Sequence, residues 1–291
     1  MQSDQFQLHA EIEQAHWWFV ARRRIVERLI AQILPPGPDA LIIDVGCGTG
    51  GNIADLADRY PCVGIDTSAE AIALARQRFP QVQFLCGWAP QDLGAKMRQA
   101  KLVLLMDVLE HVPDDFAVLS SLLAAAAPGT HFLLTVPADY ALWSAHDKSF
   151  GHYRRYDQGR LELLWAGLPV TPRLVSYFNS RLYWPIRLIR ARSQLYGGAS
   201  GRVGTDFWMP RPSVNRMLET IFAGESRRLN GLLDTNRTRG YRRGASLVAV
   251  LRREGGELLV REKPPSLPPD RGLGAVAYPQ ATPTRPVEKA L

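Results

Sequence analysis

The stretch DVGCGTGG, residues 44–51, follows the apolar residues 40–43 and leads directly into a helix-like pattern. A glycine-rich turn between a strand and a helix exposes bare main chain to a ligand, because no side chain blocks the approach. The stretch therefore predicts a strand, a ligand-binding turn and a helix, in that order. This arrangement is typical of the first unit of an open α/β sheet.

Two kinds of ligand fit the glycine spacing. Gly46, Gly48 and Gly51 match the G-x-G-x-x-G turn that binds a dinucleotide, whereas Asp44 followed by Gly46, Gly48 and Gly50 matches a turn that holds S-adenosylmethionine. The Asp44 carboxylate would repel the pyrophosphate of a dinucleotide and attract the ammonium group of S-adenosylmethionine. Asp44 therefore favours S-adenosylmethionine, which leaves Gly51 for close packing at the start of the helix. A dinucleotide is the alternative.

Strand-like apolar runs alternate with helix-like amphipathic segments through about residue 180. Such alternation is typical of a parallel sheet with helices on its faces. We expect an α/β fold with a doubly wound, mostly parallel seven-stranded sheet. The expected strands lie near 41–46, 61–66, 82–86, 101–107, 131–136, 170–177 and 245–253, and the expected helices near 51–59, 68–79, 91–99, 114–127 and 157–166.

The remaining segments are arranged around this sheet. Residues 1–37 predict an N-terminal helical cap, and residues 38–178 predict the cofactor-binding α/β core. Residues 179–243 carry two further helical patterns, which indicate a helical insertion on the substrate side before the last core strand, 244–253. Residues 254–291 are rich in proline and poor in large apolar residues, a composition that predicts a disordered tail.

Composition argues against several classes of function. The 291 residues are 46% hydrophobic, and the net charge of +7 comes mostly from arginines that are not grouped with aromatic residues, so we expect no nucleic-acid partner. No apolar run is long enough to span a membrane and the N-terminus lacks a signal peptide's apolar segment, so the cytoplasm is the expected location. The three cysteines show no metal-ligand spacing, and we expect no metal site.

Two further acids follow strands of the expected sheet. Asp66 ends the second strand in CVGIDTS, where a carboxylate accepts hydrogen bonds from ribose hydroxyls, and Asp107 opens DVLEH after the fourth strand. Together with the Asp44 turn, these elements resemble class I S-adenosylmethionine-dependent methyltransferases over roughly residues 38–140. The resemblance implies a Rossmann-like fold and S-adenosylmethionine as the cofactor. The expected cofactor contacts are Asp44, Gly46, Cys47, Gly48, Gly50, Asp66, Thr67, Trp88, Asp107 and Val108.

The adenine end of the expected cofactor site departs from this family. After the third strand these enzymes usually carry an acid that accepts from the adenine amino group, but this chain reads Gly87-Trp88-Ala89. Trp88 is a candidate to lie against the adenine ring, with Asp92 as a substitute acceptor. The alternative is that Trp88 is ordinary packing at the sheet edge.

The methyl acceptor is expected beyond the carboxyl ends of the strands, where ligands of open α/β sheets bind. The segment TVPADYALWSAHDKSFGHYRRYD follows the fifth strand and combines histidines, acids, arginines and aromatic residues. His146 or His152 is the expected general base for an acceptor hydroxyl, and Arg154 or Arg155 would hold an acceptor carboxylate or phosphate. The alternative is that Asp147, His152 and the arginines only hold this loop in place.

The N-terminal segment HWWFVARRR offers a second part of the acceptor site. Its helix is expected to close over the cofactor, with an aromatic residue such as Trp18 facing the substrate and Arg22 reaching the methionine carboxylate. Alternatively, its aromatic residues pack against the sheet and its arginines face water. The expected substrate-binding residues are Trp18, Arg22, His111, Trp143, Tyr153, Arg154 and Arg155.

The leading hypothesis is a small-molecule methyltransferase that acts by in-line transfer on an oxygen of an anionic or lipid-like acceptor, with carbon or nitrogen as alternative targets. An NAD-dependent oxidoreductase and a non-catalytic cofactor-binding module are the alternatives from other classes. Residues 179–195 mix aromatic, aliphatic and arginine side chains, which suits either peripheral membrane contact or packing beside the substrate pocket. No oligomeric state follows from the sequence.

Overall fold

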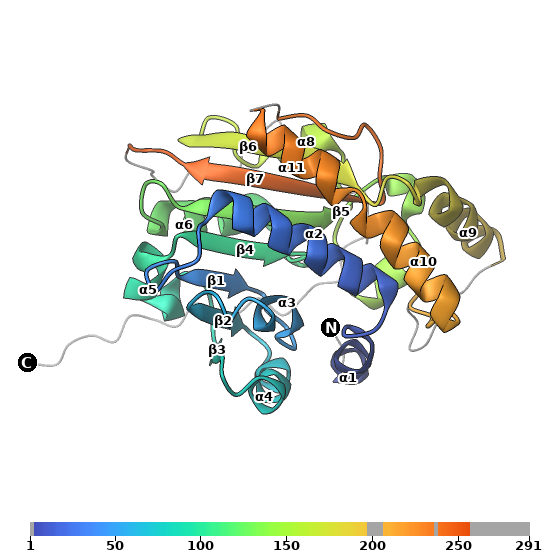
Figure 1. Ribbon diagram of the computed structural model, residues 1–291, viewed down its shortest axis with the longest axis horizontal. Coiled ribbons are helices and arrows are strands. Elements are labelled where there is room, and N and C mark those ends of the chain that lie inside the picture. Colours follow the sequence, from blue (N-terminus) through green and yellow to red (C-terminus); the bar gives the residue numbers. More distant parts are fainter. Residues whose placement is uncertain (1–2, 197–205, 236–237, 257–291) are drawn as a thin grey trace, which may run out of the picture.

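Figure 1 shows the computed structural model of the chain, which describes residues 3–196, 206–235 and 238–256. Its centre is a seven-stranded sheet with the order β3-β2-β1-β4-β5-β7-β6. The strands are β1 (Ile42–Val45), β2 (Cys62–Asp66), β3 (Gln83–Cys86), β4 (Leu102–Met106), β5 (His131–Pro137), β6 (Val170–Phe178) and β7 (Ser246–Arg253). All neighbours are parallel except β7, which is antiparallel to β5 and β6. The expected α/β sheet is confirmed, whereas the predicted tail lies, from residue 257 onwards, outside the described residues.

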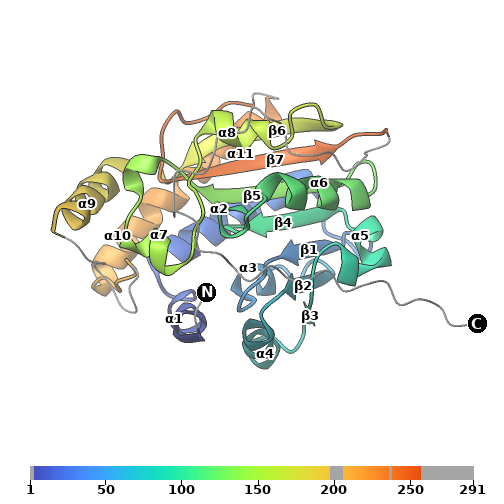
Figure 2. The same cartoon turned by 180° about the vertical axis from the view of Figure 1, so that it is seen from behind.

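Helices cover both faces of the sheet, and the central strands are buried as a result. Every residue of β1 and β4 is buried, and the neighbouring residues Ile42 and Ile43 pack into the two different cores. Figures 1 and 2 show the two layers from opposite sides. One layer contains α2 (Trp17–Ile33), α3 (Gly51–Ala54), α4 (Ala69–Arg78), α10 (Pro212–Ala223) and α11 (Ser226–Asp234), and the other contains α5 (Ala95–Gln99), α6 (Asp115–Ala125) and α8 (Gln158–Leu163).

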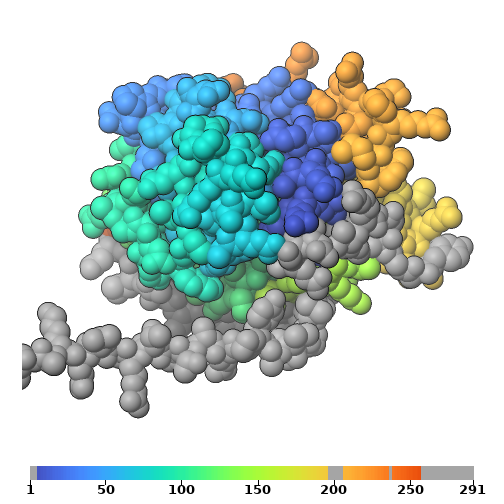
Figure 3. All heavy atoms as spheres, turned by 90° about the horizontal axis from the view of Figure 1, so that it is seen from below, coloured from blue at the N-terminus to red at the C-terminus, as the bar shows by residue number. Residues whose placement is uncertain are grey.

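The N-terminal helices connect the core to the helices that precede β7. α1 (Ser3–Ile12) contacts α4, and α2 packs along α10 and α11. The Trp17 amide donates to Asn215 Oδ1 (2.9 Å), which fixes the start of α2 against α10. Figure 3 shows the dark-blue N-terminal residues between the cyan segment and the orange α10. The cap is thus packed against both the core and the segment 179–243.

Several elements differ in detail from the expected ones. The helix expected at 51–59 ends early, since α3 covers only Gly51–Ala54, and the loop after β5 contains a short 3-10 helix (Tyr140–Leu142) and α7 (Ala145–Ser149), neither of which was expected. Ser144 and Asp147 form a capping box at the start of α7. The segment 179–243 begins with α9 (Tyr183–Tyr196). Within the described ranges, each helix is too short or too polar to cross a membrane.

Candidate active site

The turn after β1 requires glycine at the positions that the S-adenosylmethionine signature uses. Gly46, Gly48 and Gly50 have φ angles of +72°, +52° and +83°, in the left-handed region that disfavours side chains. Gly51 is instead the first residue of α3, and a Cβ atom there would lie 2.4 Å from the carboxyl carbon of Glu13. The prediction that Gly51 serves close packing is confirmed.

Asp44 lies on β1 with a fully buried side chain. Neither of its carboxylate oxygens has a hydrogen-bond partner among the described residues. Burial raises the pKa of this carboxyl group to about 8, against a smaller opposing effect of the Arg22 guanidinium. A buried acid without a partner destabilises a fold, and an ammonium ligand is the kind of group that would satisfy it.

The other acids of the expected nucleoside site bind main-chain amides. Asp66, at the end of β2, accepts from the amides of Gly48 (2.9 Å) and Ser68 (2.9 Å), which ties the glycine turn to the second strand. Asp92 accepts from the amide of Trp88 (2.7 Å) and so holds the loop after β3. The Trp88 side chain is 67% exposed. Ribose binding by Asp66 and adenine stacking by Trp88 stay predictions.

A cavity of about 540 Å³ lies at the carboxyl ends of β1 and β4. Its walls come from the N-terminal helices, the glycine turn, the end of β4, the loop after β5 and α9. The predicted residues that line it are Gly46, Cys47, Gly48, Asp107, Trp18, Arg22, His111, His146, His152 and Arg155. The cavity therefore joins the methionine end of the expected cofactor site to the expected acceptor site.

Other predicted contacts lie outside the lining of this cavity: Asp44, Gly50, Asp66, Thr67, Trp88, Val108, Trp143, Tyr153 and Arg154. Val108 still shapes the turn, because a Cβ atom on Gly46 would lie 2.7 Å from Val108 Cγ2. Trp143 stacks on Tyr140, with ring centres 6.5 Å apart, and Tyr153 packs beside the Arg154 guanidinium. The structure therefore does not bring Trp143 or Tyr153 to the cavity as substrate contacts.

The predicted role of Arg154 as an acceptor clamp is wrong. Its side chain is fully buried, and its guanidinium donates to the main-chain carbonyls of Leu109 (2.9 Å), Val112 (2.6 Å) and Pro113 (2.7 Å). Asp115 Oδ2, 3.6 Å from Arg154 Nη1, supplies a counter-charge. Arg154 therefore holds the turn after β4 instead of a substrate.

The two predicted bases differ in which ring nitrogen is available. His146 Nδ1 accepts a hydrogen bond from the main-chain amide of Asp206 (3.0 Å), so the ring proton is on Nε2 and no lone pair remains for an acceptor proton. Burial also lowers the pKa of His146 well below its usual range. His152 Nδ1 lies 3.0 Å from Asp147 Oδ1 and donates to it, which leaves a lone pair on Nε2. Of the two histidines, only His152 fits a base.

Asp147 connects the charged side chains along one wall of the cavity. It accepts from Arg155 Nε (2.8 Å) and Nη2 (3.1 Å), and Arg190 Nη1 lies 3.7 Å from Asp147 Oδ2. Burial favours the protonated acid, but Arg155 and His152 outweigh it and hold the pKa of Asp147 well below its usual range. Asp147, His152 and Arg155 thus hold the loop together, while His152 and Arg155 also line the cavity.

Arg22 crosses the cavity from α2 to the core. Its guanidinium forms an ion pair with Asp107 and donates to Asn52 Oδ1 (2.9 Å). Arg22 Cζ also lies 4.4 Å from the centre of the Trp18 ring, a cation–π contact. The Arg22 side chain is only 5% exposed. The alternative in which the arginines of the N-terminal segment face water is therefore excluded for Arg22.

Sequence reasoning missed several residues of the cavity wall. Glu110 is buried with an unpartnered Oε2, and burial together with the Asp107 carboxylate raises its pKa well above the usual range. Glu110 belongs to the DVLEH segment that the sequence singled out, but it was not among the predicted site residues. His9 and Phe207 lie 5.5 Å apart between ring centres, and burial lowers the pKa of His9 to about 3. No local pattern brings these two distant residues together.

Comparison with known proteins agrees with this geometry. A family profile described as a methyltransferase domain matches residues 18–183. The chain belongs to this methyltransferase family. It is a class I S-adenosylmethionine-dependent methyltransferase, and S-adenosylmethionine is the methyl donor of that family.

Curated relatives match part of this methyltransferase. Trans-aconitate 2-methyltransferase of Variovorax paradoxus (strain S110) is 36% identical over 124 residues, which cover 40% of this chain and 45% of that protein. The protein of the same name from Azoarcus sp. (strain BH72) is 35% identical over 124 residues, covering 41% and 47%. The chain spans about half the length of the curated relatives it matches.

Solved structures share the fold over most of the chain. The plantazolicin methyltransferase BpumL in complex with SAH gives a TM-score of 0.52 at 12% identity, covering 87% of this chain and 90% of that chain. The plantazolicin methyltransferase BamL gives 0.51 at 13% identity, covering 87% and 91%. At these identities the likeness shows the fold alone.

Proposed function

We propose that this methyltransferase moves a methyl group from S-adenosylmethionine to an oxygen of a small anionic acceptor. The observation that carries the proposal is the course of one cavity, which runs from the glycine turn to the histidine and arginine side chains of the loop after β5. A donor bound on the turn and an acceptor bound on the loop would meet within it. Carbon and nitrogen acceptors remain the alternatives.

The residues at the turn fit the methionine end of the cofactor. Asp44 is buried without a partner and needs a positive charge, which the ammonium group would supply. Arg22 Nε is likewise buried without a partner among the described residues, and it suits the methionine carboxylate. The bound cofactor supplies a methyl group already activated by its sulfonium. The task of the protein is then to hold the acceptor in line in a water-poor cavity.

Arginine side chains on the cavity wall support an anionic acceptor. Arg155 and Arg190 both line the cavity and are bound to acids, Arg190 Nη1 lying 2.6 Å from Asp206 Oδ2. A guanidinium has five N–H donors and keeps some of them for a second carboxylate. The curated relatives are named for an anionic substrate, trans-aconitate, which supports the same class of acceptor.

The nature of the acceptor oxygen decides whether a base is needed. A carboxylate is already ionised at neutral pH, whereas a hydroxyl must lose its proton as it attacks the methyl group. For a hydroxyl acceptor we place that loss at His152 Nε2. Asp147 fixes the tautomer of His152, and the ring lines the cavity.

Two measurements test the class of cofactor and the class of acceptor. Calorimetric titration with S-adenosylhomocysteine should show saturable binding, and fluorescence titration with NADH should show none; the opposite result would indicate an NAD-dependent oxidoreductase. A mass-spectrometric screen of carboxylic and hydroxy acids with S-adenosylmethionine should find a methylated acid. Mild base cleaves a methyl ester but not a methyl ether or an N- or C-methylated product. Cofactor binding without methyl transfer to any acceptor would indicate a non-catalytic binding module.

A lipid-like acceptor is the second candidate, because exposed apolar side chains surround part of the cavity. Ile189 (57% exposed) and Trp208 (62% exposed) both line it, and Trp184 on α9 is 61% exposed. These side chains suit an acceptor with an alkyl chain and keep peripheral membrane contact as a prediction. Co-sedimentation with anionic vesicles tests that contact. Equal sedimentation of the wild type and an Ile189→Ser/Trp208→Ser variant would exclude it at these residues.

A further inference from the structure

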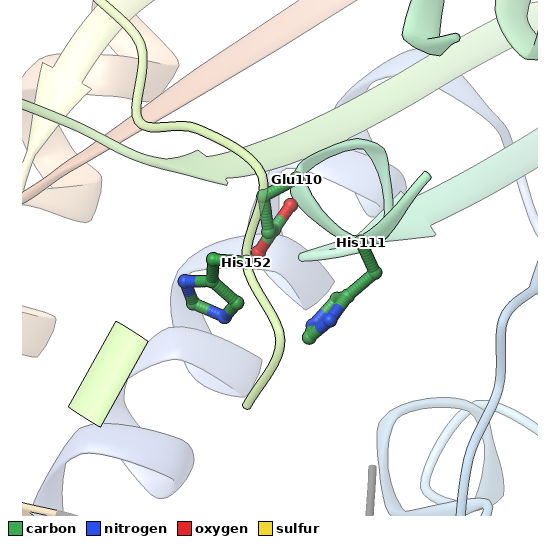
Figure 4. A group of neighbouring side chains, drawn as sticks. All are labelled: Glu110, His111 and His152. Carbon is green, nitrogen blue, oxygen red and sulfur yellow. The ribbon is translucent and has the colours of Figure 1, made fainter. Parts of the chain in front are cut away.

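We propose that Glu110, His111 and His152 form a binding site for a divalent transition-metal ion on the acceptor wall of the cavity. One donor atom from each side chain lies within 4.8 Å of the others. Figure 4 shows the three side chains directed toward a common space, two from the turn after β4 and one from the loop after α7. The inference rests on the proposed function, because the ion would bind the acceptor.

The protein fixes these two segments against each other. The Tyr153 amide donates to the Glu110 carbonyl (2.7 Å), directly beside His152. The Arg154 guanidinium binds the Leu109 and Val112 carbonyls on either side of the Glu110-His111 pair. Metal sites need side chains held in position by such supporting contacts. Arg154, which was predicted to hold the acceptor, therefore holds Glu110 and His111 in place beside His152.

The His152 imidazole has one nitrogen engaged with the protein and one left over. His152 donates through Nδ1 to Asp147, so its Nε2 presents a lone pair. A histidine that binds a metal commonly donates its other N–H to a carboxylate or a carbonyl, which fixes the tautomer and the ring orientation. His152 shows this pattern.

Glu110 supplies the negative charge of the proposed site. Its side chain is buried, and its Oε2 has no partner among the described residues. A buried carboxylate oxygen without a partner is costly, and a bound cation removes that cost. His111 and His152 meet edge to face, with ring centres 4.6 Å apart, so their nitrogens are within reach of the same ion as Glu110.

The ligand types indicate which ion the site would take. Two imidazoles and one carboxylate suit Zn²⁺ and similar first-row ions, whereas Mg²⁺ prefers oxygen ligands alone. Ligand atoms around a tetrahedral Zn²⁺ lie about 3.4 Å apart, given metal–ligand distances of about 2.1 Å. The side chains must therefore close by an ångström or more on binding the ion, and His111 is the least buried of the three residues. Three protein ligands leave a position open to the cavity.

An ion at this site would act on the acceptor oxygen. It would bind a carboxylate or hydroxyl and lower the pKa of a bound hydroxyl, whose proton then leaves to solvent. The S–CH₃ bond of S-adenosylmethionine breaks as the O–CH₃ bond forms. His152 promotes the loss of the proton through the ion instead of accepting it directly. Two adjacent acceptor oxygens, as in a 2-hydroxy acid, would bind such an ion best.

Metal titration of the tag-free protein tests the site without any methyl transfer. Calorimetry with Zn²⁺ should give one ion per chain, and Glu110→Gln and His152→Gln should each weaken the Zn²⁺ affinity at least tenfold. His131→Gln, at the start of β5 and outside the cavity lining, is the matched control and should bind like the wild type. Co²⁺ absorption should show nitrogen and oxygen ligands without a thiolate charge-transfer band, which separates this site from the cysteines.

Each outcome decides for or against the ion. Equal Zn²⁺ affinity in the wild type and Glu110→Gln, a thiolate band with Co²⁺, or no saturable binding would overturn the site and leave His152 as a free base. S-adenosylhomocysteine affinity, measured on the same samples, should be unchanged in Glu110→Gln. If the wild type did not bind S-adenosylhomocysteine, this result would contradict the proposed function but leave the Zn²⁺ result intact. If Glu110→Gln does not fold, His111→Gln serves in its place.

Discussion

Arg22 on α2 forms an ion pair with Asp107 at the end of β4, across the cavity that both residues line. The same guanidinium donates to Asn52 in α3, while its Nε has no partner among the described residues. Arg22 therefore connects the N-terminal cap to the core and retains a donor for a ligand. The cap therefore lines the cavity as well as covering the sheet.

Arg22→Gln should weaken S-adenosylhomocysteine binding about tenfold or more, because hydrogen bonds to charged groups contribute about 1.5–3 kcal/mol. The melting temperature should fall as well, since Asp107 loses its partner. Arg24→Gln is the control, because Arg24 is 56% exposed and pairs with Glu219 away from the cavity lining. Calorimetry on both variants makes the comparison. Equal affinities would show that Arg22 does not contact the cofactor.

Gly48→Ala and Gly50→Ala should separate cofactor binding from stability. Both glycines have positive φ, so each variant should lose about 1–2 kcal/mol from backbone strain. A Cβ atom on Gly48 meets nothing within 4 Å, but Gly48 lines the cavity, so its methyl group should reduce S-adenosylhomocysteine affinity. A Cβ atom on Gly50 would lie 2.7 Å from Phe84 Cζ, which adds overlap in the core. Gly50→Ala should therefore have the lower melting temperature, and the reverse order would contradict this assignment.

The core of the fold was predictable because its signals are local. β4 is a continuous apolar run, β1 is apolar apart from Asp44, and the positive φ angles of the turn demand the glycines that the sequence shows. Asp44 and Asp66 follow from the same local patterns. The different roles of Gly50 and Gly51 were also predictable. The Asp44 carboxylate argues against a pyrophosphate and therefore against the spacing that ends at Gly51. The other spacing uses Gly50 and leaves Gly51 for packing.

The acceptor wall was less predictable because long-range contacts determine it. Arg154 and Arg155 are adjacent, yet one binds the turn after β4 and the other binds Asp147 beside the cavity. The tautomer of His146 depends on the amide of Asp206, a residue 60 positions away. The local sequence shows the residue types, but it does not show which partner each side chain contacts or which ring nitrogen carries the proton.

Arg154→Lys should destabilise the protein without a direct loss of substrate contacts. A lysine cannot reproduce the bonds to three carbonyls and leaves buried carbonyl acceptors unpaired, at a cost of about 1–3 kcal/mol for each unsatisfied group, whereas Asp115 keeps its bonds from Arg160 and Tyr156. Thermal unfolding should show a clear fall relative to the exposed control Arg98→Lys. If Arg154 instead held the acceptor, the variant would raise KM for the acceptor at an unchanged melting temperature.

Asp44→Asn should stabilise the free protein and prevent tight cofactor binding. The pKa of Asp44 is raised from 3.8 to about 8 in the folded protein, so the unfolded chain is ionised over a range in which the folded chain must hold a proton. Stability therefore falls as the pH rises from about 4 to about 8, and is constant above that range. The amide variant lacks this dependence, so its advantage in stability over the wild type should grow between pH 5 and pH 8. Unfolding at several pH values measures the difference.

The same carboxyl group should couple cofactor binding to pH. An ammonium ligand binds the ionised form of Asp44, so S-adenosylhomocysteine affinity in the wild type should rise between pH 6 and pH 8 with release of a proton. Calorimetry in two buffers of different ionisation enthalpy detects that proton, and Asp44→Asn should release none and bind at least tenfold more weakly. A wild-type affinity independent of pH, with no proton released, would mean that Asp44 is not the group that receives the cofactor's ammonium.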